Sequence, residues 1–223
     1  MRHKLSVSGP RSSFPIRRTI AMFPGHASGV SAVEFALILP LMLTLYAGTA
    51  EMAHAIDNWR KVTELARTVA DLTSQGDTDS TQPIRSSTMN DILASSTAVL
   101  RPFTAANAKI VVSALAVDTV ASPLNPKVCS SVATSNATAR NTGVATDLPI
   151  PAGFGVDGNR YVLAEVSMPY APMIGTSLVK LVNGINGSIM LKVSFPWPTR
   201  GGQPYKSTTN TSEVILPGGA ACP

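Results

Sequence analysis

The feature that most constrains the fold is an apolar run near the N-terminus. Between Phe35 and Ile56, a stretch of 22 residues, Glu51 is the only charged residue. An α-helix of that length extends about 33 Å, which is enough to cross a bilayer hydrocarbon core of roughly 30 Å. Pro40 removes one backbone donor, and membrane-spanning helices tolerate such a loss. We therefore expect a transmembrane helix over residues 30–56.

The charge distribution predicts how this helix is oriented. Residues 1–33 contain five basic residues and no acidic one, and the rest of the chain holds 13 of each kind. Basic residues before the first apolar helix favour a cytoplasmic N-terminus. We therefore expect a basic cytoplasmic leader over residues 1–29 and an extracytoplasmic domain over residues 57–223, with the helix in the inner (cytoplasmic) membrane. Residues 34–223 carry no net charge, which argues against a nucleic-acid partner.

A secretory signal peptide is the main alternative reading of the apolar run. Ala53-His54-Ala55 has the small-residue pattern of a signal peptidase site, and cleavage after Ala55 would release a secreted domain. The leader would then be 55 residues long, whereas signal peptides usually have about 15–30 residues. The apolar run is also longer than a usual signal-peptide core of about 7–15 residues. A retained helix is therefore favoured.

The sequence at the N-terminal end of the apolar run resembles a known processing site. Gly29-Val30-Ser31-Ala32-Val33-Glu34-Phe35 is similar to the type IV prepilin site, where Gly ends a basic leader and Glu is the fifth mature residue. The longer string GVSAVEFALILPLMLTLYAGTAEMAHAI resembles the TadE/TadG-like pseudopilins of tight-adherence (Tad) pilus systems. Residues 29–73 carry the resemblance, through Val33-Glu34-Phe35-Ala36, Leu39-Pro40-Leu41, Gly48 and Glu51.

The resemblance implies a role in building an adhesive pilus of the Flp/Tad type. A prepilin peptidase would cut between Gly29 and Val30, and Glu34 and Phe35 would belong to the assembly segment. In the family, the carboxylate at the position of Glu34 pairs with the N-terminal amine of a neighbouring subunit. The implied partners are that peptidase, other pilus or pseudopilus subunits and inner-membrane lipid. An uncleaved single-pass binding module of the cell envelope remains the competing interpretation.

The rest of the chain predicts an α+β fold. Apolar residues at helical spacing extend the first helix to about residue 75 and form one stripe: Ile56, Trp59, Val62, Leu65 or Ala66, Val69 and Leu72. A second helix is expected over 85–100, strands over 108–118, 160–170 and 188–197, and a short amphipathic helix over 172–184. Residues 119–159 are expected to form a surface excursion and 199–223 an irregular tail. We expect a long N-terminal helix, transmembrane and then amphipathic, packed on a small antiparallel sheet in a pilin-like fold.

The reactive side chains predict a disulfide and no catalysis. Cys129 and Cys222 are the two cysteines, and in an exported domain they are expected to pair. No histidine follows residue 57, so the body lacks the usual general base and metal ligand. Asp147, Asp157 and Glu165 have no motif context and are expected to be structural. We expect neither enzymatic activity nor a cofactor or metal.

Overall fold

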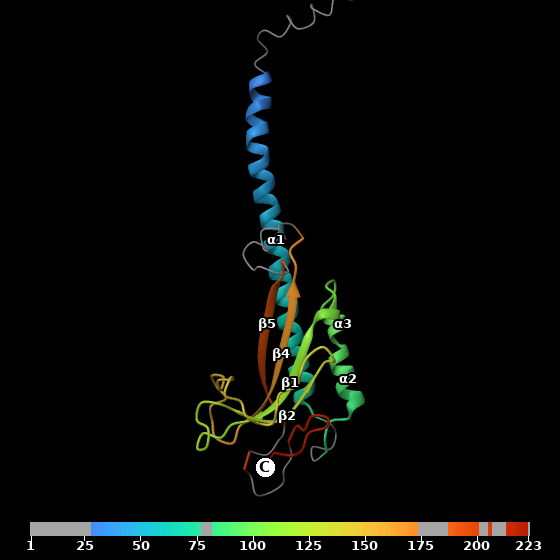
Figure 1. Ribbon diagram of the computed structural model, residues 1–223, viewed down its shortest axis with the longest axis vertical. Helices are drawn as coiled ribbons and strands as arrows, with labels where there is room; N and C mark the ends of the chain where they lie inside the picture. Colours follow the sequence, from blue (N-terminus) through green and yellow to red (C-terminus); the bar gives the residue numbers. More distant parts are fainter. Residues whose placement is uncertain (1–27, 77–81, 174–186, 201–204, 207–212, 223) are drawn as a thin grey trace, which may run out of the picture. The chain divides into compact units, whose positions relative to one another are not determined.

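The protein is described by a computed structural model, which places residues 28–76, 82–173, 187–200, 205–206 and 213–222. The chain divides into two compact units, Met1–Ala47 and Gly48–Pro223. The described part of the first unit is helical throughout. The second unit contains a sheet, shorter helices and the continuation of the long helix (Figure 1).

The long helix α1 covers Ser28–Ser74, 47 residues in all, and it is about 70 Å long. Pro40 lies inside it, and the carbonyl oxygen of Pro40 accepts a hydrogen bond of 2.7 Å from the Thr44 hydroxyl. The helix ends where Gly76 adopts a φ of 70° and donates its N–H to the Thr73 carbonyl at 3.1 Å. Glycine favours this left-handed conformation, which explains the predicted stop near residue 75.

Five antiparallel strands form one sheet: β1 (Lys109–Ala116), β2 (Lys127–Ala133), β3 (Gly143–Val144), β4 (Arg160–Tyr170) and β5 (Ile189–Pro198). Their order in the sheet is β3-β2-β1-β4-β5, and every neighbouring pair is antiparallel. β5 and β3 are therefore the two edge strands. The expected α+β fold, with a long helix and an antiparallel sheet, is confirmed.

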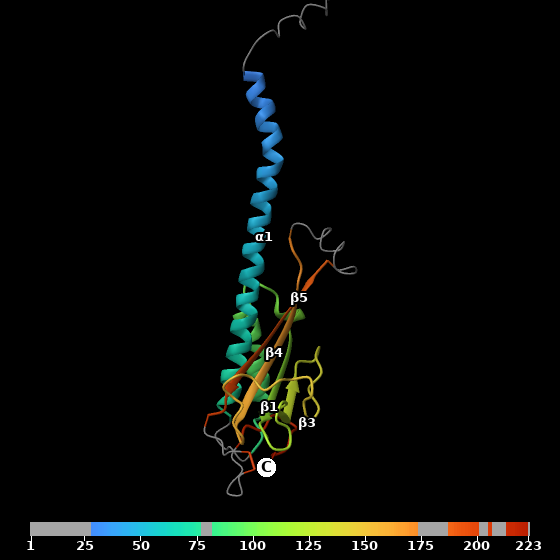
Figure 2. The ribbon, with the colours of Figure 1, turned by 90° about the vertical axis from the view of Figure 1, so that its left-hand side faces the viewer.

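The part of α1 within the second unit lies along one face of this sheet (Figure 2). Alternate residues of β1, β4 and β5 point toward the helix, because successive side chains of a strand face opposite sides. Helices α2 (Ser86–Ala94) and α3 (Ser96–Val99) and the 3-10 turn η2 (Ala105–Asn107) follow α1. Ser95 separates α2 from α3, so the helix expected over 85–100 is formed in two pieces. The main core comprises Val62, Leu65, Val69, Met89, Leu100, Ile110, Val112, Val162, Val166 and Leu216, among others.

The buried stripe of α1 differs from the predicted one at three positions. Ile56, Trp59 and Leu72 were expected in the core, but all three are substantially exposed. Asn58 and Thr73 are buried in their place. The stripe therefore lies on a neighbouring face of the helix, which includes polar residues, with Ser74 buried as well.

The opposite face of the sheet is covered by the segment expected to be a surface excursion. Leu148, Ile150 and Phe154 pack on a second cluster made by Leu115, Val117, Val128, Ala145, Tyr161 and Leu163. The expectation of a mere excursion over 119–159 was wrong, because this segment also contributes β2 and β3. The amphipathic helix expected over 172–184 lies outside the described residues beyond Met173.

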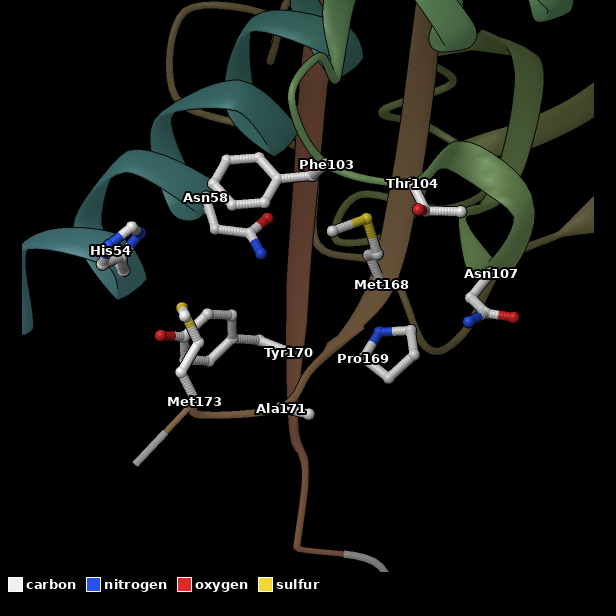
Figure 3. Close-up of a pocket in the computed structure, with 10 residues that line it drawn as sticks. All are labelled: His54, Asn58, Phe103, Thr104, Asn107, Met168, Pro169, Tyr170, Ala171 and Met173. Atoms are coloured by element: carbon white, nitrogen blue, oxygen red, sulfur yellow. The ribbon is translucent and has the colours of Figure 1, made fainter. Parts of the chain in front are cut away.

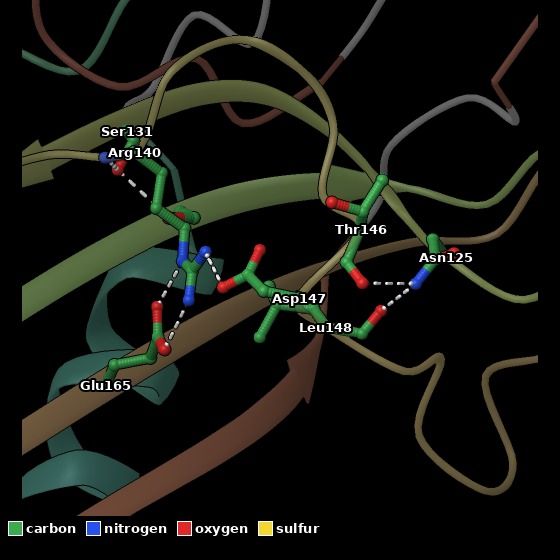
Figure 4. A network of polar contacts seen from close by, with 8 residues as sticks. Asn125, Ser131, Arg140, Thr146, Asp147, Leu148 and Glu165 are labelled. Atoms are coloured by element: carbon green, nitrogen blue, oxygen red, sulfur yellow. Dashed lines mark hydrogen bonds and ion pairs between the residues drawn. The ribbon is translucent and has the colours of Figure 1, made fainter.

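Arg140 fastens this covering segment to the sheet (Figure 4). Its guanidinium donates to both carboxylate oxygens of Glu165 on β4, one of them at 2.8 Å, and to Asp147 Oδ2 at 2.7 Å. Its backbone N–H donates to Ser131 Oγ at 3.0 Å. The bidentate pairing fixes the guanidinium in both position and orientation. The bond from Arg140 also holds the pKa of Asp147 below its usual value.

The C-terminal tail is fixed to the sheet by a disulfide and a buried ion pair. Cys129 of β2 and Cys222 are joined by a disulfide, with their Cα atoms 5.2 Å apart. Arg160 of β4 pairs with Glu213 and also donates to the Cys222 carbonyl oxygen at 2.7 Å. A Cβ added at Gly219 would lie 2.5 Å from Ser130 Cβ, so the tail packs directly on β2. The predicted disulfide is thus present in the structure.

Candidate functional site: the N-terminal helix

The predicted processing and assembly residues lie in the first two turns of α1. Gly29 and Val30 follow its first residue, and both are exposed to solvent. A Cβ added at Gly29 would meet no atom within 4 Å. Val30 and Glu34 are four residues apart, so they lie one above the other on the same helix face. Phe35, also exposed, lies beside Glu34.

The helix exposes an unbroken apolar surface beyond these residues. One window of α1 has a mean hydropathy of 1.9, and none of it is buried within the protein. Its length and composition suit a membrane span. The large apolar side chains exposed there are Val30, Val33, Phe35, Leu37, Ile38, Leu39, Leu41, Met42, Leu43, Leu45 and Tyr46. A soluble monomer rarely exposes this much apolar area, so the length and composition of the helix suggest a single-pass membrane anchor.

The second unit begins at Gly48 and contains Glu51, the one charged residue of the apolar run. The carboxylate of Glu51 accepts a hydrogen bond from the Tyr170 hydroxyl at the end of β4. The same oxygen, Oε1, accepts the backbone N–H of Met173 at 3.0 Å. Burial, followed by the bond to Glu51, raises the pKa of Tyr170 to about 12, so this hydroxyl remains a donor at neutral pH.

A pocket lies beside this contact, between α1 and the end of β4 (Figure 3). Its volume is about 260 Å³. Phe103, Met168, Pro169, Tyr170 and Met173 form apolar walls, and His54, Asn58, Thr104 and Asn107 contribute polar groups. Asn58 is 3% exposed, and its Oδ1 has no hydrogen-bond partner in the structure. The walls suit an apolar group, and Asn58 Oδ1 is a buried acceptor without a donor.

Asp147, Asp157 and Glu165, the carboxylates considered for acid–base chemistry, all have structural hydrogen-bond partners. Asp147 and Glu165 both hold the Arg140 guanidinium. Asp157 accepts bonds from the backbone N–H of Thr119 at 2.7 Å and from its hydroxyl at 3.0 Å. Within the described residues, no group of three or more His, Cys, Asp or Glu side chains is placed to hold a metal ion. The three carboxylates thus have structural contacts, and none lies in the pocket of Figure 3.

Comparison with known protein families gives one match. The family model described as TadE-like protein matches residues 29–71. Residues 29–71 are thus similar to TadE-like proteins, and we call them the TadE-like segment. The match confirms the resemblance predicted from the sequence, and it starts at the predicted cleavage glycine. A search of curated proteins and a search of solved structures each gave no match.

The TadE-like segment coincides with most of α1, so the family match spans both units. TadE-like proteins are pilus-associated structural proteins and are not known as enzymes. Their association with pili implies contacts with other pilus components. The residues predicted for processing and assembly, from Gly29 to Phe35, lie in this segment and are the candidate functional site.

Sequence reasoning missed the partners of Glu51 in the TadE-like segment. Tyr170 was seen only as the last residue of a strand, and Met173 was assigned to a helix. One signal was available, because a charge inside an apolar run requires a partner. The sequence does not indicate which of the distant donors approaches it.

Proposed function

We propose that this chain is a membrane-anchored pseudopilin-like subunit of a Tad-type adhesive pilus, processed between Gly29 and Val30. The observation that carries the proposal is the TadE-like match over residues 29–71, on a helix whose apolar surface is exposed. Residues 1–29 are the cytoplasmic leader and 30–56 span the inner membrane. Residues 57–223 form the extracytoplasmic domain, which is the oxidising side where a disulfide persists.

The mechanism is lateral assembly through the helix. Removal of the leader leaves an amine on Val30, close to the carboxylate of Glu34. A carboxylate at the edge of hydrocarbon is costly when unpaired and tolerable when it has a cationic partner. Pairing of Glu34 with the Val30 amine of a neighbouring subunit would set the axial position of one helix against the next. Small residues on the helix, such as Ala32, Ala36 and Gly48, permit close packing.

The Glu51 contact favours this reading over a secreted domain cut after Ala55. Cleavage there would remove the partner of Tyr170 and of the Met173 amide. It would also remove Ala55 itself, which packs against the main core. A mature chain that begins at Val30 keeps all of these contacts.

The deciding experiment is to determine the N-terminus of protein extracted from membranes of cells that contain a prepilin peptidase. We expect a mature chain of 194 residues that begins at Val30. Gly29→Leu should retain the leader, because a branched side chain obstructs a cleft that accepts glycine. Gly48→Leu is the matched control: it too lies in open space on α1, and it should be cleaved normally.

Two other N-termini would each overturn part of the proposal. Intact protein beginning at Met1 in the presence of active peptidase would indicate the uncleaved envelope module. A chain beginning at Ile56 and recovered free of membrane would indicate a secreted domain. Normal cleavage of Gly29→Leu would show that the peptidase does not select this glycine.

A further inference from the structure

The end of the sheet nearest Glu51 exposes apolar side chains on more than one side. Met173 is 77% exposed, and Ile189 and Met190 at the start of β5 are also exposed. Met52 and Ile56 of α1, which both follow Glu51 in the sequence, are exposed as well. We call these five residues the end patch. None of them carries a charge at any pH.

The strand in this patch is unusual because both of its faces are open. Ile189 and Met190 are consecutive, so their side chains point to opposite faces of β5. Farther along the same strand, Leu191 is buried in the main core. Two exposed apolar faces at a strand end are unfavourable in water, and they are compatible with an apolar surrounding.

The hydrogen bonds to Glu51 place the β4–β5 end of the sheet beside residue 51 of α1. Tyr170 pairs with Ile189 across the two strands, and Tyr170 also bonds to Glu51. Glu51 lies five residues before Ile56, the end of the apolar run, which is about 7.5 Å along a helix. The headgroup layer on each side of a bilayer is about 5–8 Å thick. The predicted span, residues 30–56, is about 40 Å long as a helix, which matches a bilayer together with its headgroups. If this span crosses the whole bilayer, Glu51 and the strand end lie at the inner edge of the headgroup layer.

We infer that the end patch is a membrane-contact surface, with which the β4–β5 end of the domain inserts into the headgroup layer beside its own anchoring helix. This inference rests on the proposed membrane anchor. Its occupant is bilayer lipid, and because the patch is uncharged, the contact depends on apolar burial and not on anionic headgroups. The same geometry supplies Glu51 with two donors at a depth where a bare carboxylate is costly.

The test uses the full chain reconstituted into phosphatidylcholine vesicles, with an environment-sensitive fluorophore on one introduced cysteine at a time. The native disulfide leaves no other thiol. Met173→Cys reports the end patch. Leu124→Cys is the matched control, because Leu124 is 76% exposed and lies near the other end of the sheet, where Ile150 donates to its carbonyl oxygen. Leu41→Cys reports the anchor.

We expect the emission at position 173 to shift to shorter wavelength and to be quenched by nitroxide lipids, as at position 41. The emission of the fluorophore at position 124 should remain at the wavelength typical of water. Addition of phosphatidylglycerol should leave the shift at 173 unchanged. If the fluorophore at position 173 reports water while the one at position 41 reports membrane, the end-patch inference is overturned and the anchor stands. The end patch would then be left to a protein partner. A water-like signal at 41 would overturn the anchor and the inference together.

Discussion

Glu34 and Glu51 are the two acidic residues between residues 30 and 56, and their surroundings differ. Glu51 receives the Tyr170 hydroxyl and the Met173 amide from its own chain. Glu34 lies on the exposed surface of α1, one turn beyond Val30. The Glu51 carboxylate thus serves the fold of the chain, whereas the exposed Glu34 carboxylate is free of the domain core and suits the assembly contact that we propose.

Glu34→Gln should permit membrane insertion and cleavage but impair pilus assembly. Insertion depends on the length of the apolar run and on the basic leader, and the substitution changes neither. Glutamine keeps the shape and the hydrogen-bonding capacity but loses the charge, so a defect isolates the ion pair with the Val30 amine. Piliation and the mature N-terminus should be scored in the same cells, by electron microscopy and by sequencing.

The matched control for that experiment is Glu64→Gln. Glu64 is an exposed glutamate of the same helix, paired with Lys61 at 3.4 Å, and an exposed pair of this kind contributes little. Its substitution should leave piliation unchanged. Wild-type pili from a correctly cleaved Glu34→Gln protein would remove the charge of Glu34 from the assembly mechanism.

At the scale of elements, the register of the buried stripe on α1 predicts different costs for two similar substitutions. Leu65→Ala deletes a side chain that is 0% exposed and should destabilise the domain by about 2–5 kcal/mol. Leu72→Ala makes the same chemical change where the side chain is 37% exposed and should cost about 0.5 kcal/mol or less. Thermal unfolding of the detergent-solubilised protein measures both. Equal costs would place Leu72 in the core, as the sequence pattern had suggested.

The sequence predicted most of the regular elements and fewer of their contacts. Strands near 160–170 and 188–197 were clear because their β-branched and aromatic residues alternate with polar ones. β2 was missed because Lys127–Ala133 contains two serines and a cysteine within a stretch rich in turn residues. It forms a strand through its pairing with β1, which is a tertiary effect.

For the candidate site too, the sequence predicted the local features of the helix but not its distant contacts. Gly29, Val30 and Glu34 were found because their spacing is local and resembles a known processing signal. The helix face was assigned wrongly because apolar side chains cover two neighbouring faces of α1, and Asn58 and Thr73 lie on the buried one. A polar residue in a helical pattern normally argues for exposure. The contacts that bury it come from strands far away in the sequence, so local periodicity does not reveal them.

At the scale of the whole molecule, the tail is held by one covalent link across 93 positions of sequence. Loss of this link in Cys129→Ser/Cys222→Ser should lower the free energy of unfolding by about 4–5 kcal/mol in the simple chain-entropy model. The buried Arg160–Glu213 pair should keep the tail in place in the folded variant. Denaturant midpoints with and without reductant measure the effect.

The control is the wild-type protein under reduction, which should approach the midpoint of the double variant. The double variant itself should not respond to reductant. Two alkylatable thiols in freshly extracted, non-reduced wild-type protein would contradict the pairing.

The two borders of the sheet have a further consequence for the pilus assembly that we propose. Pro196 and Pro198 of β5 are paired with β4, and since proline has no N–H, the free border of β5 lacks two donors there. The other border, β3, is two residues long. Short strands and prolines at a border are common devices against strand-to-strand aggregation. Both described borders therefore carry features that disfavour strand-to-strand stacking between copies, and in the proposed assembly the contacts between subunits would be made by the helix.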